Sequence, residues 1–250
     1  MTGGTLACSR QAHRVAFYGQ GTCSERRCAF CRQSLDCALV SISTKRGDTG
    51  TTGLLYGGRV RKDSERIECN GAVDEAQAAL GYARAVVQGT GASGPGNLTS
   101  DALDGMLVSI ERDLWVLMAE VATSNSNRSK LVAGTSLVTP AMVDVLTSRV
   151  QAMEALQVVP KEFVVPGESL AGAALDIART VVRRAERLAV AAELPVASAV
   201  VPYLNRLSDL CWLLARAIER DHLTARAGPV KRTRQSPRLA PSDSDPVDGQ

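Results

Sequence analysis

Residues 101–123 carry apolar side chains at the spacing of one face of a helix. These are Leu103, Leu107, Ile110, Leu114, Leu117 and Val121. Steps of three and four residues return to the same side of an α-helix, so the pattern predicts a helix with one face in a core. Either Thr99 or Ser100 is the expected N-cap, because a hydroxyl can accept from the free N–H groups of a first turn.

Four further segments have the same character, over residues 72–88, 140–156, 169–193 and 197–223. Pro140 begins one of them after Thr139, the expected cap, since proline lacks the N–H that a first helical position leaves free. Aromatic residues make up only 4% of the chain, which favours close-packed helices over a β-sandwich. Because the connections are short and the helices long, we expect an all-α fold, a five-helix antiparallel bundle.

Both ends of the chain differ in composition from this helical part. Residues 1–39 are basic and rich in Cys and Gly, and we expect a mobile Cys-rich extension there. Residues 227–250 are rich in Pro, Ser and charged residues. Such a segment buries too little apolar surface to offset the entropy of ordering, so we expect a disordered tail. One helical domain is predicted over residues 40–226.

The cysteines form two groups. The extension holds one C-x2-C pair with irregular flanks, in Cys23, Cys28, Cys31 and Cys37. A zinc site usually shows two well-spaced pairs or added histidines, so zinc is the less favoured interpretation. Cys69 and Cys211 stand alone in the helical part, which predicts reduced thiols that act as small apolar side chains. The predicted location is the cytoplasm, or the mitochondrial matrix in a eukaryote.

Several function classes are disfavoured by composition. The net charge of +3 is small, and no basic surface interleaved with aromatics predicts nucleic acid binding. No apolar run approaches the roughly 18 residues of a membrane span. His13 and His222 are the only histidines, and both lie outside or at the edge of the predicted core. A hydrolase or a proton-abstracting enzyme would more often bring a catalytic histidine.

Four arginines and one glutamate fall within residues 179–187. The helical period places most of them on one face, namely Arg179, Arg183, Glu186 and Arg187. Arginine presents permanently charged donor forks to phosphate oxygens, so this face suits a polyanion. A solvated helix face with a local ion pair remains the alternative.

A loop rich in glycine and hydroxyl side chains, residues 43–53, precedes the helices. Glycines let backbone N–H groups approach phosphate oxygens, and Lys45 adds charge. The loop is not a Walker A motif, because no Gly-Lys-Ser/Thr triplet ends it. An ordinary surface turn is the alternative interpretation.

Two acid-containing pairs stand on predicted helices. Asp74 and Glu75 are expected to open the first helix, where carboxylates suit the positive end of the helix dipole. Asn205 and Asp209 are one turn apart on the last helix and are expected to face the bundle. Polar groups in that position need partners, either on other helices or on a ligand.

Six segments occur in a distinctive order, Thr44–Gly50, Arg59–Asp63, Asp74–Glu75, Phe163–Gly167, Arg179–Arg187 and Asn205–Asp209. This order resembles the PduO-type ATP:cob(I)alamin adenosyltransferases, over about residues 42–220. The resemblance implies a five-helix bundle that assembles as a homotrimer with active sites between subunits. It also implies transfer of the 5′-deoxyadenosyl group of ATP to cob(I)alamin, giving adenosylcobalamin and triphosphate.

The resemblance carries site residues with it. Those matching the nucleotide site are Thr44, Lys45, Arg46, Gly47, Asp48, Gly50, Thr51, Thr52, Lys62, Arg183, Glu186 and Asn205. Glu186 also matches the Mg²⁺ position. Phe163 matches the aromatic beneath the corrin, which displaces the lower axial ligand, and Asp74 and Arg179 match a pair that joins neighbouring subunits. With Arg183, these three are the predicted catalytic residues.

The sequence departs from the family pattern at several positions. Arg46 and Thr49 stand where the loop commonly has threonine and lysine, and Val73 stands in place of a usual threonine. Asp176 occupies a position where many members have histidine. An acid one turn before Arg179 can pair with it or with Arg183 and weaken phosphate contact.

Two other function classes remain open beside the enzyme. The same scaffold can act as an adenosylcobalamin carrier with weak or no turnover, and it can dock to a cobalamin reductase or an adenosylcobalamin-dependent mutase. A helical protein with no nucleotide role is the third class. A di-iron protein is disfavoured, because it needs Glu-x-x-His pairs on facing helices and the sequence has none.

Overall fold

The computed structural model of the chain describes residues 43–219. Contacts divide the chain into two compact units, residues 1–44 and 45–250, and the helices and strands of the described residues lie in the second. Its helices are α1 (Glu65–Thr90), α2 (Ser100–Val121), α3 (Pro140–Ala155), α4 (Leu170–Ala191) and α5 (Val200–Ile218), with a short 3₁₀ helix η2 (Asn125–Lys130). The prediction of a mainly helical fold is confirmed. The extension, its zinc alternative, both histidines and the tail lie outside the described residues.

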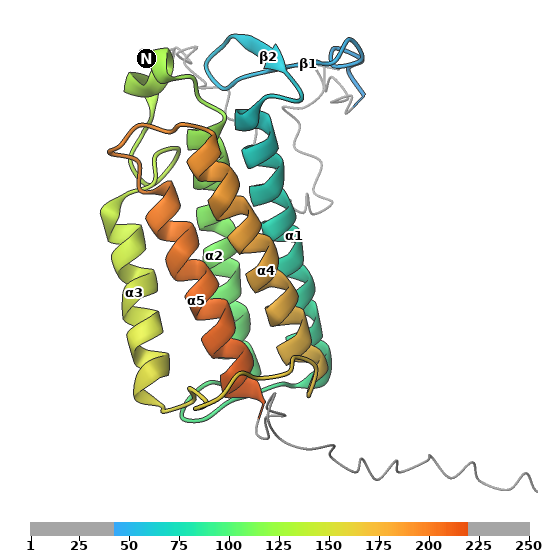
Figure 1. Ribbon diagram of the computed structural model, residues 1–250, viewed down its shortest axis with the longest axis vertical. Coiled ribbons are helices and arrows are strands. Elements are labelled where there is room, and N and C mark those ends of the chain that lie inside the picture. The colour runs from blue at the N-terminus through green and yellow to red at the C-terminus, as the bar shows by residue number, and fades with distance from the viewer. Residues whose placement is uncertain (1–42, 220–250) are drawn as a thin grey trace, which may run out of the picture. The chain divides into compact units, whose positions relative to one another are not determined.

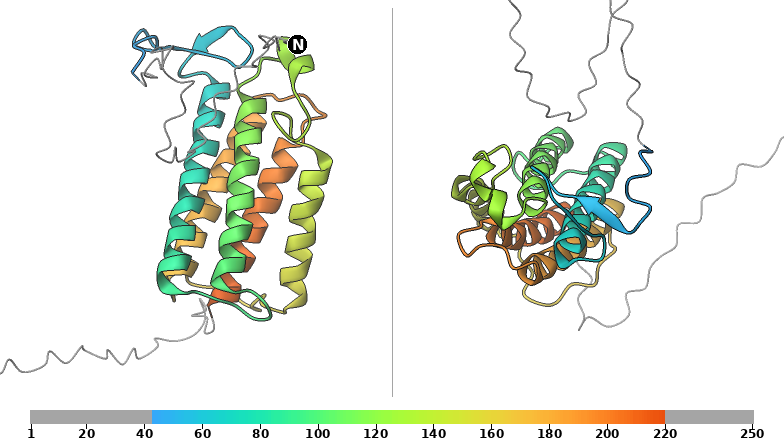
Figure 2. Two further views of the ribbon diagram at one scale, coloured as in Figure 1. Left: turned by 180° about the vertical axis from the view of Figure 1, so that it is seen from behind. Right: turned by 90° about the horizontal axis from the view of Figure 1, so that it is seen from above.

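Consecutive helices run in alternating directions (Figure 1). α4 packs between α1 and α5, while α2 packs on α1 and α3 packs on α5. Figure 2 shows the same arrangement from behind and along the helices. Ala174, Ala178 and Ala185 of α4 are buried, and small side chains let neighbouring helices approach closely. α4 can therefore be central and still present a charged outer face.

The predicted apolar stripe of α2 lies entirely in the core, since all six of its members have no exposed surface. The predicted caps are also present. The Thr99 side chain accepts from the amide of Ala102 at the start of α2, and that of Thr139 accepts from Met142 at the start of α3. Thus helical period and hydroxyl caps together determine where these two helices begin.

The first helix begins earlier than predicted, at Glu65 and not at residue 72. Its first turn contains Glu65 and Glu68, which suit the positive end of the helix dipole. Asp74 and Glu75 consequently lie in the third turn. The prediction that these two acids open the helix is wrong, and their charges need another explanation.

A short hairpin precedes α1, formed by strands β1 (Thr51–Gly53) and β2 (Arg59–Arg61). The sequence predicted only a loop here. The strands pair antiparallel, with Thr52 opposite Val60. The amide of Leu55 donates to the Ala122 carbonyl over 2.9 Å. This bond ties the hairpin to the C-terminal end of α2.

Glu120 organises the loops at that end of the helices. Its side chain is fully buried. It accepts from Arg128 at 2.6 Å, from the Ser198 hydroxyl at 2.6 Å and from the Val138 amide at 2.7 Å. Arg128 and Val138 of the α2–α3 connection and Ser198, which precedes α5, therefore converge on one carboxylate. A buried charge is tolerated when it is hydrogen-bonded in this way.

None of the helices in the described part of the chain is long and apolar enough to cross a membrane.

Candidate active site

The glycine-rich loop closes on itself and on Lys62. The Gly50 amide donates to the Gly47 carbonyl over 3.2 Å, and the Lys62 amide donates to the Gly50 carbonyl over 2.9 Å. Gly50 has a φ of +77°, which favours glycine over other residues. A Cβ on Gly47 would lie 2.9 Å from Nζ of Lys62. The lysine predicted from a separate motif thus lies against the loop.

Arg59 braces the same loop from β2. Its guanidinium donates to the Arg46 carbonyl at 2.7 Å and to the Thr51 hydroxyl at 2.8 Å. Thr51 and Thr52 lie in β1, and the side chains of Lys45, Arg46 and Asp48 are exposed. Thr44 belongs to the other unit and is exposed. Arg59 begins one of the six ordered segments, yet its bracing role depends on strand pairing that the sequence did not predict.

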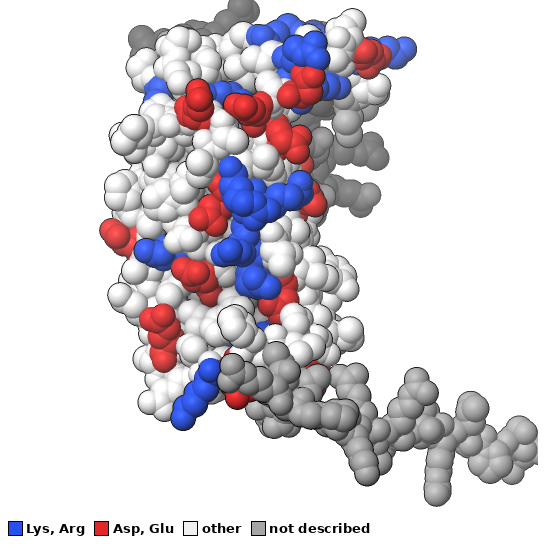
Figure 3. Space-filling model, in the orientation of Figure 1, with Lys and Arg blue, Asp and Glu red and all other residues white. Residues whose placement is uncertain are grey.

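The exposed side chains of Arg183 and Arg187, with Glu186 between them, form what we call the arginine face of α4. The Arg187 guanidinium donates to the Arg183 carbonyl at 3.0 Å. Arg184 turns aside and pairs with Glu75 of α1. Figure 3 shows basic side chains gathered about halfway along this side of the molecule.

Asn205 links the arginine face to α5. Its amide nitrogen donates to Glu186 over 3.2 Å, and its oxygen accepts from Arg206 at 2.8 Å. Asp209 is exposed and pairs with Arg206 at 3.6 Å. The prediction that Asp209 faces the bundle is wrong, because only Asn205 of that pair is turned toward α4.

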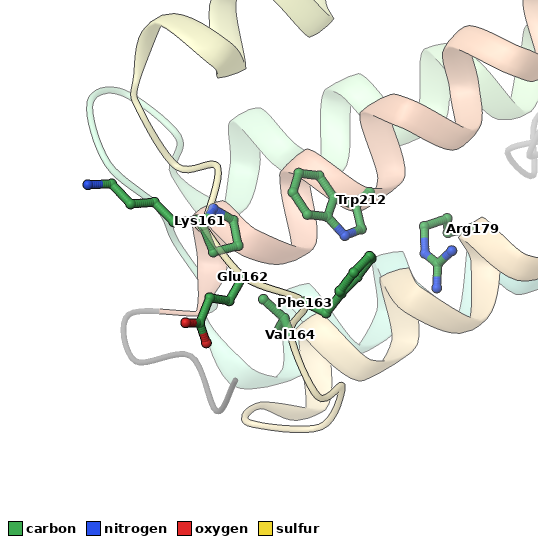
Figure 4. Close-up of a pocket in the computed structure, with 7 residues that line it drawn as sticks. Lys161, Glu162, Phe163, Val164, Arg179 and Trp212 are labelled. Atoms are coloured by element: carbon green, nitrogen blue, oxygen red, sulfur yellow. The ribbon is translucent and has the colours of Figure 1, made fainter. Parts of the chain in front are cut away.

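A cavity of about 590 Å³ opens between the α3–α4 connection and the helices α4 and α5. It is lined by Pro160, Lys161, Glu162, Phe163, Val164, Arg179 and Trp212 (Figure 4). The side chain of Phe163 is 90% exposed. Aromatic rings are well suited to the flat face of a large ligand.

Trp212 is a lining residue that sequence reasoning left out of the site. The sequence does contain a usable signal, because Trp212 follows Asn205 by two helical turns and so shares its side of α5. Its indole approaches the buried guanidinium of Arg216, with 5.9 Å from Cζ to the ring centre. Arg216 was likewise not predicted, since nothing in the sequence marks it as buried.

Next to this cavity lies a group that we call the Asp176 cluster, made of Asp176, Arg179, Arg216 and Glu219, of which Arg179 lines the cavity itself. Asp176 accepts from Arg179 over 3.1 Å. Of the two pairings considered from the sequence, the one with Arg179 is therefore present. Asp74, the expected inter-subunit partner of Arg179, is exposed on α1 and makes no ion pair within residues 45–219.

The two cysteines of the helical part are free, as predicted, and both are buried in the structure. Burial raises the pKa of the Cys69 thiol to about 11 and that of the Cys211 thiol to about 12. Both thiols are therefore protonated near neutral pH and poor nucleophiles. They belong to the core and take no part in the chemistry of the site.

No group of three or more His, Cys, Asp or Glu side chains suited to a resident metal ion occurs in the described part of the chain. Mg²⁺ often needs only one or two protein carboxylates when a nucleotide supplies phosphate oxygens. Glu186 is the carboxylate on the arginine face. The residues present thus fit an ion that arrives with a nucleotide.

Comparison with known proteins identifies the family. A sequence model described as cobalamin adenosyltransferase matches residues 42–218. The chain belongs to this family. This chain is 35% identical over 181 residues to a corrinoid adenosyltransferase of Bacillus subtilis, and the match covers 72% of this chain and 86% of the relative. It is 38% identical over 190 residues to one of Mycobacterium bovis, covering 73% and 91%.

A solved structure agrees with these relatives. It is a variant of a PduO-type ATP:corrinoid adenosyltransferase from Lactobacillus reuteri complexed with cobalamin and ATP. The TM-score is 0.62 and the sequence identity is 27%, and the match covers 75% of this chain and 100% of the solved chain. The predicted PduO-type family and the predicted class of enzyme, a corrinoid adenosyltransferase, are confirmed.

Proposed function

We propose that this adenosyltransferase moves the 5′-deoxyadenosyl group of ATP to cob(I)alamin. The cobalt(I) electron pair attacks the 5′ carbon, a cobalt–carbon bond forms, and the carbon–oxygen bond breaks with its electrons leaving on triphosphate. The observation that carries the proposal is the pairing of exposed cations with an aromatic cavity in a member of this family. The carrier alternative is not favoured by the relatives, which are named as adenosyltransferases.

The nucleotide would be held by the loop and by the arginine face. Lys45, Arg46 and Lys62 supply charge beside the backbone amides of the loop. Arg183 is exposed and free to turn its guanidinium toward a phosphate. Charge collects on the departing triphosphate, so cations placed there stabilise the transition state more than the ground state.

Glu186 and Asn205 would complete the nucleotide site. The hydrogen bond from Asn205 holds the Glu186 carboxylate at 3.2 Å, which fixes its direction. We propose that this carboxylate meets the Mg²⁺ ion that accompanies ATP. When bound, the ion neutralises phosphate charge and orients the triphosphate.

The corrinoid would lie over Phe163 in the aromatic cavity. Cob(I)alamin is already a strong nucleophile, so the transfer needs no protein base. Closeness of the reactants and exclusion of water are the larger requirements. Phe163 can take the place below the ring, where it excludes water and a lower axial ligand. Trp212 forms the neighbouring wall.

We propose a homotrimer of five-helix bundles for the assembled enzyme. The hairpin lies beyond the N-terminal end of α1, whereas the arginine face lies along α4 (Figures 1 and 3). A neighbouring subunit can bring a second hairpin to that face. Asp74 of one subunit would then meet Arg179 of the next. We further propose a protein of the cytoplasm, or of the mitochondrial matrix in a eukaryote, that docks to a cobalamin reductase or to an adenosylcobalamin-dependent mutase.

An anaerobic assay with chemically reduced cobalamin and MgATP tests the proposed function. The absorbance change from cob(I)alamin to adenosylcobalamin is followed for the parent enzyme, Arg183→Ala and Arg184→Ala. We expect turnover by the parent, a loss of about 100-fold or more in Arg183→Ala because a transition-state cation is removed, and little loss in Arg184→Ala. Tight binding of adenosylcobalamin without turnover would indicate a carrier, and absence of both would leave only the fold in common with the family.

A further inference from the structure

Asp176 connects two arginines on two different helices. Its Oδ1 accepts from Nε of Arg179 at 3.1 Å, and its Oδ2 accepts from Nη2 of Arg216 at 2.6 Å. The Asp176 residue is only 5% exposed. One buried carboxylate therefore ties Arg179 of α4 to Arg216 of α5, and both of its oxygens are used.

Arg216 has a second carboxylate partner. Its Nη2 lies 2.9 Å from Oε2 of Glu219, and Arg216 is 2% exposed. The Glu219 carboxylate lies so close to Gly172 that a Cβ there would overlap it. Gly172 is in the first turn of α4, where the positive end of the helix dipole favours a carboxylate. Glu219 can thus balance Arg216, which leaves the charge of Asp176 to balance Arg179.

The cluster reaches the aromatic cavity at two points. Arg179 lines the cavity directly, and Arg216 lies behind its Trp212 wall at 5.9 Å from the ring centre. Figure 4 shows Arg179, Trp212 and Phe163 around the same hollow. A hydrogen bond at Nε fixes the plane of a guanidinium and leaves its outer N–H groups available. Asp176 therefore decides how the Arg179 fork faces a ligand in the cavity.

We propose that Asp176 is a positioning residue for the corrinoid. It fixes the direction of the Arg179 fork and balances its charge, and through Arg216 it supports Trp212. The cavity then offers the corrin a preformed wall whose donors suit neutral amide side chains better than phosphate. This inference rests on the proposed function, because it takes the aromatic cavity as the corrinoid site. It goes further in assigning a role to a residue that touches neither substrate.

Steady-state kinetics of Asp176→Asn test the proposal, with Asp144→Asn as the matched control on the exposed side of α3. Arg179 and Arg216 each bond a different oxygen of Asp176, and in asparagine one of these oxygens is replaced by an NH2 donor, so one guanidinium loses its acceptor. We expect kcat/KM for cob(I)alamin to fall about tenfold or more, while KM for MgATP stays within about twofold. Asp144→Asn should match the parent. Equal changes in the kinetic constants for cob(I)alamin and for MgATP, or no change in either, would overturn the proposal.

A double-mutant cycle with Arg179→Lys separates positioning from general loss of packing. Lysine keeps the charge but lacks Nε, so Arg179→Lys alone should reproduce the defect toward cob(I)alamin. Adding Asp176→Asn should then change little, because the two residues act as one unit. Additive effects of the two substitutions would overturn the proposal. Parental kinetics in Arg179→Lys would also overturn it, and this single variant is a sufficient test if Asp176→Asn does not fold.

A parent enzyme without turnover would count against the proposed function and not against this inference. Equilibrium titration with cob(II)alamin, followed by its visible spectrum, would still compare the parent with Arg179→Lys. Weaker binding by about tenfold in the variant supports the positioning role. Equal binding by the two proteins contradicts it.

Discussion

Two groups of charged side chains connect α4 with α5. The arginine face belongs to α4 and is joined to α5 by Asn205, whereas the Asp176 cluster has members on α4, on α5 and just after α5. The two groups differ in their exposure to solvent. On the arginine face, Arg183 and Arg187 are exposed, and Glu186 is held by an amide and not by a guanidinium. In the cluster, Arg216 is buried and lies between two carboxylates. An exposed arginine can still bind a polyanion, whereas the charge of an arginine buried between carboxylates is already balanced. The neighbours of an arginine, more than its place in a motif, determine its role.

Removal of Arg216 should have the largest effect on stability. Arg216→Ala removes the cation beside buried Glu219 and one of the two cations that Asp176 binds. Breaking a buried pair in this way costs about 3–5 kcal/mol. We expect the free energy of unfolding in urea to fall by that amount. Arg183→Ala, made on the open side, should stay within about 0.5 kcal/mol of the parent. A small change in Arg216→Ala would mean that the cluster does not hold α4 to α5.

The Cys211 thiol reports on the same buried region through pH. Burial raises its pKa to about 12, so the folded protein keeps a proton that the unfolded chain loses above about pH 8.5. The free energy of unfolding should therefore fall as pH rises through this window, by up to about 1.4 kcal/mol per pH unit. In Cys211→Ala that slope should be shallower. Equal slopes in urea unfolding between pH 8 and 10 would show that the thiol is not buried.

Replacement of Phe163 in the aromatic cavity should affect catalysis and leave stability unchanged. The side chain is 90% exposed, so Phe163→Ala removes little buried area and should leave the thermal midpoint unchanged. If Phe163 lies below the corrin as proposed, its ring excludes water there, and kcat/KM for cob(I)alamin should fall about tenfold or more in the variant. A lower midpoint with unchanged kinetics would assign the ring to folding.

Arg184 should give the smallest effect of the four. Its pair with Glu75 joins α1 to α4 at the surface, and both side chains are partly exposed. Surface ion pairs contribute about 0.2–1 kcal/mol, so Arg184→Ala should lower the free energy of unfolding by no more than that. A loss near that of Arg216→Ala would remove the contrast between exposed and buried pairs.

Helices and caps were predictable because they depend on short-range patterns. The stripe from Leu103 to Val121 and the cap at Thr99 each follow from a few neighbouring residues. The start of α1 was missed, because Cys69 is the only member of its buried face that precedes Ala72, and Glu65 opens the helix. The β1–β2 hairpin was missed for a related reason, since strands of three residues carry too short an alternation to recognise.

Predictions about the site depended on packing that the sequence does not specify. Lys62 and the glycine loop were predicted together through the family resemblance, and the structure places them in contact. Asp209 was placed one turn after Asn205, yet only Asn205 is turned toward Glu186, and Asp209 is exposed. Trp212 and Arg216 follow on the same side of that helix, but the partial burial of Trp212 and the burial of Arg216 depend on the α3–α4 connection and on α4. Long-range contacts of this kind leave no local pattern.

Equilibrium binding of MgATP, measured by calorimetry without corrinoid, tests the contrast between the two groups most directly. The titration compares the parent, Arg183→Ala and Asp176→Asn under one set of conditions. We predict that Arg183→Ala weakens binding by about tenfold or more, since a charge-assisted contact to phosphate is lost, while Asp176→Asn binds like the parent. Equal weakening of MgATP binding in both variants, or weakening in Asp176→Asn alone, would contradict the account that the arginine face binds the nucleotide and the Asp176 cluster does not.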